Sequence, residues 1–194
     1  MYSKLALVTA ATALSLIPSA IAQDYGSASI ENKCSFPAYI WSTAESSDKM
    51  VTLKPGESYQ EDYRSRKDNQ GGVSIKMSDK EDKGEISQFE YTITDDQVFY
   101  DLSNIDGYPF KEGGISITPS DSSCPSISCD AGVANCHEAY NQPYDDHATK
   151  GCAASADLHM TLCGSGGGSK AKKEPTYVRG SDKRSRRHAR AFEA

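Results

Sequence analysis

Short stretches in which apolar and polar residues alternate, separated by turn residues, fill residues 27–119 and constrain the fold more than any other feature of the chain. In residues 73–78, VSIKMS, every second residue is apolar, which is the period of a strand with one buried face. Turn-forming pairs separate such stretches: Pro55-Gly56, Gly71-Gly72 and Asp106-Gly107. The pattern predicts about seven or eight short strands in an all-β sandwich.

The N-terminal segment has the layout of a secretory signal peptide. Lys4 precedes the apolar run LALVTAATALSLI, which is followed by Pro18 and the small-residue pattern Ala20-Ile21-Ala22. The apolar run is shorter than the ~20 residues that span a bilayer. We therefore expect residues 1–22 to be cleaved as a signal peptide, the protein to be exported, and no membrane span.

All six cysteines follow this leader, and an even number of cysteines in an exported chain predicts three disulfides. Their spacings lack the paired CxxC units of a zinc site. The histidines His137 and His147, with Glu138, Asp145 and Asp146 nearby, are interpreted as surface residues, so no metal and no other cofactor is expected. Six cysteines permit 15 pairings, and the residues alone do not choose between them.

Residues 129–163 are small, polar and rich in cysteine, and only DAGVANCHEAY suggests a short helix. We expect a loop region that the disulfides stabilise. After Cys163, the linker-like run GSGGGSKAKKEP and the scarcity of core-forming residues beyond it predict a disordered tail, residues 165–194. Dibasic pairs at 183–184 and 186–187 would allow proteolytic removal of this tail, and a retained solubilising tail is the alternative.

Charge is divided unevenly along the chain. Residues 23–169 contain 11 Lys or Arg against 24 Asp or Glu, whereas residues 170–194 contain nine against three. Nucleic-acid binding draws on phosphate neutralisation by Lys and Arg. The acidic body therefore argues against nucleic acid as a partner.

Several runs appear in the order in which a known family has them: IENKCSFPAYIWS, LKPGESYQ, Gly71-Gly72, FYDLSNIDGYPF, ISITPS and Cys124-x4-Cys129. Together they resemble the thaumatin-like proteins, most closely their small fungal secreted relatives of the Bys and Cet type. The resemblance spans about residues 30–163. It implies that residues 23–164 form a thaumatin-like β-sandwich with a disulfide-tied C-terminal loop region, in which the two strands of Phe99–Cys129 are the central strand pair.

The resemblance also bears on the disulfides. It favours Cys136–Cys152 and suggests Cys34–Cys163, which leaves Cys124–Cys129. A second arrangement, with Cys34–Cys124 and Cys129–Cys163, would also be compatible with it.

Larger members of the family line a surface cleft with an Arg, a Glu and three Asp. Matched residue by residue, the Glu falls on Glu90, and two Asp fall on Asp101 and Asp106. The Arg position falls on Met77, where Lys76 is the only nearby cation, and the third Asp has no match. The resemblance thus implies a shallow binding cleft of Glu90, Asp101, Asp106 and Lys76.

Clustered carboxylates can share a proton and can supply the acid and the nucleophile or base of a glycosidase. Glu90, Asp101 and Asp106 are therefore the catalytic candidates if the protein is an enzyme. Because the cleft lacks the family's Arg, we favour a monomeric, non-enzymatic protein that binds cell-wall polysaccharide or a host surface protein, as an effector, adhesin or antigen. A weak β-1,3-glucan hydrolase or antifungal protein is the alternative.

Overall fold

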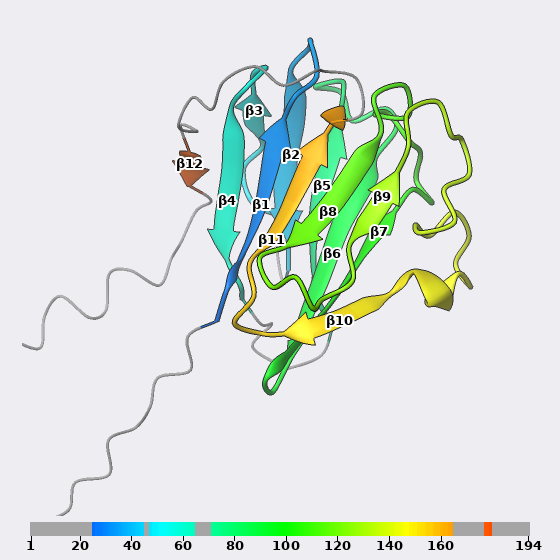
Figure 1. The fold of residues 1–194 in the computed structure, drawn as a ribbon. Helices are drawn as coiled ribbons and strands as arrows, with labels where there is room; N and C mark the ends of the chain where they lie inside the picture. Colours follow the sequence, from blue (N-terminus) through cyan, green and yellow to red (C-terminus); the bar gives the residue numbers. More distant parts are fainter. Residues whose placement is uncertain (1–24, 45–46, 65–70, 165–176, 180–194) are drawn as a thin grey trace, which may run out of the picture.

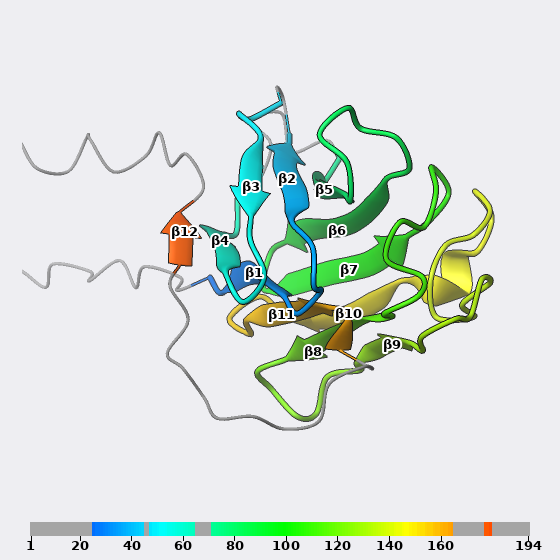
Figure 2. The ribbon, with the colours of Figure 1, turned by 90° about the horizontal axis from the view of Figure 1, so that it is seen from above.

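The computed structural model describes residues 25–44, 47–64, 71–164 and 177–179, and shows two six-stranded sheets that face each other (Figures 1 and 2). The first sheet has, in order, β12 (Tyr177–Arg179), β4 (Ser58–Asp62), β1 (Ser27–Asn32), β11 (Leu158–Leu162), β8 (Ile115–Pro119) and β9 (Ile127–Cys129). The second has β10 (Lys150–Ala153), β7 (Gln97–Ser103), β6 (Ser87–Thr94), β5 (Val73–Ser78), β2 (Ala38–Thr43) and β3 (Val51–Leu53). The predicted all-β sandwich is confirmed.

Alternation along the strands places one face of each sheet in the core between them. On β5, Val73, Ile75 and Met77 are at most 2% exposed. On β6, Phe89 and Tyr91 are buried on the core side, opposite Ile75 and Val73. Glu90 consequently lies on the outer face of the second sheet, as the alternation predicts.

The segment between Cys129 and Cys163 contains more regular structure than its composition indicates. β11 is a central strand of the first sheet, where it pairs in parallel with β1 and antiparallel with β8. β10 is the edge strand of the second sheet beside β7. The stretch predicted to form a short helix, residues 130–140, consists instead of turns, because Gly132 has a positive φ of 79° and a disulfide joins Cys136 back to Cys129.

The two strands of Phe99–Cys129 are not a pair, which corrects the prediction. β7 pairs with β6 and β10 in the second sheet, while β8 pairs with β11 and β9 in the first. The chain crosses between the sheets in residues 104–114. A long connection of this kind suits a change of sheet better than a tight hairpin does.

The structure contains the expected Cys34–Cys163 disulfide, since β1 and β11 run in parallel and end side by side at Asn32 and Leu162. The other two predicted pairings, Cys136–Cys152 and Cys124–Cys129, are wrong. The structure forms Cys124–Cys152 and Cys129–Cys136.

The physical reason for the two changed pairings lies in the β8–β9 hairpin. Cys129 lies opposite Ile115, at the start of β8, whereas Cys124 lies in the loop beyond the other end of β8. The hairpin therefore separates Cys124 from Cys129. Cys152 lies on β10 in the opposite sheet, so its disulfide to Cys124 ties the two sheets together.

The predicted signal peptide, residues 1–22, lies outside the described residues, and so does most of the predicted tail. Within that tail the structure describes residues 177–179, which form β12 against β4 rather than a disordered chain. Both predicted dibasic cleavage sites follow β12 in the sequence. A cut at either would leave this strand attached.

Candidate functional site on the outer face of the second sheet

The predicted cleft residues meet on the outer face of β5, β6 and β7. Glu90 on β6 lies directly opposite Asp101 on β7, and side chains at such positions have Cβ atoms about 5 Å apart. Lys76 on β5 lies opposite Gln88 on β6, one step along the same face. With Asp106 in the turn after β7, we call Lys76, Glu90, Asp101 and Asp106 the acidic face.

Gln88 joins the members of the acidic face. Its Nε2 donates a hydrogen bond to Asp106 Oδ2 at 3.2 Å. Its Oε1 accepts hydrogen bonds from Lys76 Nζ and, at 3.0 Å, from Ser74 Oγ. The side chain is 8% exposed, so Gln88 holds the Lys76 ammonium and the Asp106 carboxylate in fixed positions on either side of it.

Burial changes the proton affinity of the two opposed carboxylates. Burial, and then the charge of Glu90, raises the pKa of Asp101 to about 7. Burial also raises the pKa of Glu90, an effect that Lys76 and the Ser74 hydroxyl oppose and that the charge of Asp106 reinforces. The pair can thus retain a proton near neutral pH.

Met77, which matches the Arg position of larger family members, is fully buried in the core. The cation of the acidic face is therefore Lys76, from the neighbouring position on β5. Arg64 does not belong to the acidic face, because its guanidinium forms ion pairs with Glu61 and Asp48. The acidic face thus carries carboxylate charge opposed by an ammonium group rather than by a guanidinium.

A loop fixed by the disulfides borders the β7 side of the acidic face. Tyr140 N–H donates to the Leu102 carbonyl at 2.9 Å, and Asn104 N–H donates to the Tyr140 carbonyl at 2.8 Å, so the loop lies along β7. The Tyr140 hydroxyl hydrogen-bonds with Thr149 Oγ1 at 2.8 Å. Asp101 Oδ1 is buried and has no hydrogen-bond partner. One carboxylate oxygen of the Glu90–Asp101 pair therefore accepts no hydrogen bond.

Phe99 presents an aromatic ring beside the carboxylates, a feature that the sequence analysis missed. It precedes Asp101 by two residues on β7 and therefore shares its face, and it is 40% exposed. Gly151 on β10 lies opposite Phe99. A Cβ at Gly151 would approach the Phe99 ring to 3.3 Å, so the glycine leaves room for the ring to lie across the edge strand.

Residues 79–86 border the other side of the acidic face. Ile86 N–H donates to the Asp106 carbonyl at 3.1 Å. Gly107 has a φ of 122°, and a Cβ there would lie 2.5 Å from the Glu85 Cβ, so this close approach requires glycine. The Lys83 ammonium lies 4.7 Å from the centre of the Trp41 ring, and Trp41 is only 4% exposed although it is on the outer face of β2.

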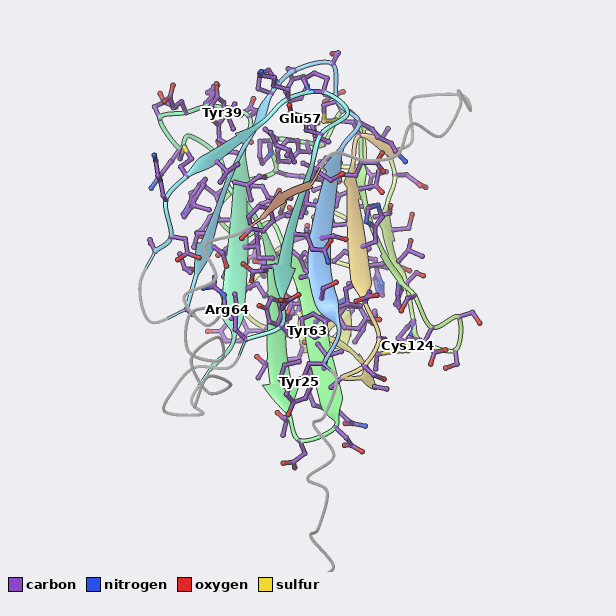
Figure 3. The ribbon with its side chains drawn as sticks, turned by 90° about the vertical axis from the view of Figure 1, so that its left-hand side faces the viewer. Tyr25, Tyr39, Glu57, Tyr63, Arg64 and Cys124 are labelled. Atoms are coloured by element: carbon purple, nitrogen blue, oxygen red, sulfur yellow. A yellow bond between two sulfur atoms is a disulfide. The ribbon has the colours of Figure 1, made fainter. Side chains whose placement is uncertain are left out.

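A separate polar cluster lies on the side of the molecule that carries β12 (Figure 3, with Arg64 labelled). Its centre is the carboxylate of Glu61, which is 8% exposed. Four groups donate hydrogen bonds to this carboxylate: the hydroxyls of Tyr59, Tyr91 and Ser42, and Arg64 Nη2. Since these donors come from both sheets, Glu61 acts as a polar link within the sandwich.

Within the described residues, no group of three or more His, Cys, Asp or Glu side chains is placed to hold a metal ion. His137 and His147 lie with their ring centres 4.6 Å apart on the disulfide-fixed loop. Among the same residues, no helix has the length and apolar character needed to cross a bilayer.

Comparisons with known proteins agree with this architecture. Residues 15–164 match the family described as Blastomyces yeast-phase-specific protein. An antigenic thaumatin-like protein of Arthroderma benhamiae is 50% identical over 194 residues, which cover 98% of this chain and 99% of that protein. A secreted thaumatin-like protein, calA, of Emericella nidulans is 39% identical over 140 residues, 71% of this chain and 81% of that protein.

Among solved structures, the fold is similar to that of a protein elicitor from Magnaporthe oryzae, with a TM-score of 0.60 at 24% identity over 71% of this chain and 98% of that one. The two facing sheets, the three disulfides and these relatives define a small fungal thaumatin-like protein. Within that class, the chain belongs to the Blastomyces yeast-phase-specific protein family. The predicted resemblance is confirmed.

Proposed function

We propose that this thaumatin-like protein acts outside the cell by binding a neutral cell-wall polysaccharide through the acidic face and Phe99. The observation that carries the proposal is the side-by-side position of an exposed aromatic ring, Phe99, and a carboxylate pair, Glu90 and Asp101, on one sheet face. The apolar face of a sugar ring can pack on an aromatic ring. Carboxylates beside that ring can accept hydrogen bonds from sugar hydroxyls.

The charge of the site supports a neutral ligand. An acidic polysaccharide would meet like charges at Glu90, Asp101 and Asp106, which costs binding energy. An extracellular site of action is supported by the names of two relatives, one called secreted and one called antigenic.

A pull-down on insoluble β-1,3-glucan tests the proposal. We expect the wild-type protein to be retained, and Phe99→Ala and Asp101→Asn each to weaken binding by about tenfold, the usual effect of losing a charge-assisted hydrogen bond or an aromatic contact. Tyr25→Ala is the matched control, because Tyr25 is also exposed but precedes β1 in the other sheet. If no glycan retains the wild-type protein, polysaccharide binding is refuted and a host surface protein becomes the candidate partner.

Hydrolysis of β-1,3-glucan is the second candidate function. It is favoured by the pKa of about 7 at Asp101, which would let this residue donate a proton near neutral pH while Glu90 acts as nucleophile or base. Release of reducing sugar that is lost in both Glu90→Gln and Asp101→Asn would establish this activity. Retention on glucan without any release would instead leave the binding function alone.

A further inference from the structure

β4 has a neighbour on both sides only because the C-terminal segment pairs with it. In the first sheet β12 lies outside β4, and residues 177–179 are opposite residues 58–60 in a parallel register. Figure 2 shows β12 at the rim of the molecule next to β4. Without β12, β4 would be the edge strand, and an edge strand presents N–H and C=O groups that can pair with another chain.

The main-chain groups of β4 divide between its two neighbours. Asn32 N–H donates to the Glu57 carbonyl at 3.0 Å, and Tyr63 N–H donates to the Gly26 carbonyl at 3.0 Å. Antiparallel strands bond through alternate residues, so the odd-numbered residues from 57 to 63 bond toward β1. The even-numbered Ser58 and Gln60 therefore direct their N–H and C=O groups toward β12.

The register identifies the groups that join β12 to β4. Val178 lies opposite Tyr59. In a parallel ladder, a residue on one strand bonds through its N–H and its C=O to the two residues that flank its partner on the other strand. Val178 is thus the residue whose N–H and C=O are placed to reach Ser58 and Gln60.

The length of the connection allows β12 to reach β4 within one molecule. Glu31 on β1 lies opposite both Thr161 on β11 and Ser58 on β4, so β11 ends at the level where β4 begins. From β11 to β12 the distance is three strand spacings, about 14 Å. Residues 163–176, 14 in number, connect the two strands, and a chain of that length can reach at most about 46–50 Å, which is well beyond the distance to be covered.

We propose that the β4 edge is a strand-docking site and that the segment around Val178 is its tethered, exchangeable occupant. A short connection that can span the distance gives an effective concentration on the order of 1 mM. At that concentration, a segment with a Kd of about 0.1 mM is docked for roughly nine-tenths of the time. The three paired residues are few, so the tether contributes much of the occupancy, and a free peptide of the same sequence binds the vacated edge at millimolar concentration.

Amide hydrogen exchange of the full chain, measured by NMR, tests the first half of the proposal. Val178→Pro removes the N–H that β12 contributes. We expect the Gln60 amide to exchange about tenfold faster, because the docked fraction protects it. The Tyr59 and Glu61 amides, which bond toward β1, should not change. Ala171→Pro is the control variant, since it places a proline outside β12.

A synthetic peptide of residues 172–183 tests the second half. At about 1 mM, it should restore protection of Gln60 in the Val178→Pro protein, whereas the same peptide with proline at the Val178 position should not. Unchanged Gln60 exchange in Val178→Pro would overturn the proposal, because β12 would then not cover the edge. Loss of protection that the peptide fails to restore would also overturn it, because the edge would then accept the segment only as part of the same chain.

Discussion

Glu90 and Asp101 face each other across β6 and β7, and the charge of Glu90 contributes to the raised pKa of Asp101, about 7. Glu90→Gln should therefore lower the pKa of Asp101, while burial, the larger cause, should keep it above the ordinary value of about 3.9. A carbon-13 NMR titration of the Asp101 carboxyl measures this change. Glu112→Gln is the control, because the Glu112 side chain is 85% exposed. This variant should leave the Asp101 titration unchanged. An identical titration in both variants would contradict the coupling.

The same pKa makes stability depend on pH in a defined direction. A carboxyl whose pKa is raised by folding binds its proton more tightly in the native state, so the free energy of unfolding falls as pH rises from about 4 to about 7. In Asp101→Asn this decline should shrink by about 1–3 kcal/mol. Urea denaturation at pH 4 and pH 7 measures it. A decline as steep as that of the wild type would show that Asp101 titrates normally.

Glu61 should be a strong determinant of stability. Glu61→Gln replaces an acceptor oxygen by an amide that meets the donors around it, and leaves the half-buried Arg64 guanidinium with less negative charge. Breaking a buried ion pair from one side commonly costs about 3–5 kcal/mol. Tyr59→Phe, which removes a single donor, should cost only about 1 kcal/mol. Equal losses in chemical denaturation would refute the central role of Glu61.

The disulfides should contribute unequally to stability. In the chain-entropy account, a bridge stabilises more when it closes a longer loop. Cys34–Cys163 spans 129 residues and Cys129–Cys136 spans 7. Replacing both cysteines by serine should therefore cost about 5 kcal/mol for the first and about 2 kcal/mol for the second. Peptide mapping of the unreduced protein provides the prior check that Cys124 is joined to Cys152.

Trp41 should report the position of residues 79–86. It is the single tryptophan of the chain and is covered by the Lys83 side chain. Lys83→Ala should increase quenching of its fluorescence by acrylamide, because the ring loses its cover. Lys80→Ala, an exposed substitution in the same segment, should leave the quenching constant near that of the wild type. Equal quenching in the two variants would show that other groups shield the ring.

Strands with one solvent-exposed face could be predicted from the alternation of apolar and polar residues. A strand inside a cysteine-rich, polar segment could not. β5 and β6 alternate clearly, so their core faces and the outward position of Glu90 follow from the period. Leu158, Met160 and Leu162 of β11 alternate too. In a cysteine-rich, polar segment, however, five residues carry little weight against the expectation of a disulfide-held loop.

The candidate site, like the fold, could be predicted from the sequence only in part. The resemblance to thaumatin-like proteins brought Glu90 and Asp101 together, and strand alternation gave only the outward face of Glu90. Phe99 could not be recognised, since an aromatic residue in a strand is more often core than surface. The disulfide pairing depends on which ends of the β8–β9 hairpin lie near β10, and this is a property of the folded chain rather than of cysteine spacing.

The parallel pairing of β1 with β11 has a consequence for how the protein is assembled. β1 is among the first strands of the sandwich to leave the ribosome, yet one of its two neighbours lies about 130 residues later in the sequence. The first sheet cannot close, and Cys34 cannot meet Cys163, until nearly the whole domain has been made. Such distant pairing slows folding. Over that interval the thiol of Cys34 is open to exchange with the four cysteines that are made before Cys163, so correct oxidation depends on reshuffling after synthesis rather than on the order in which the cysteines appear.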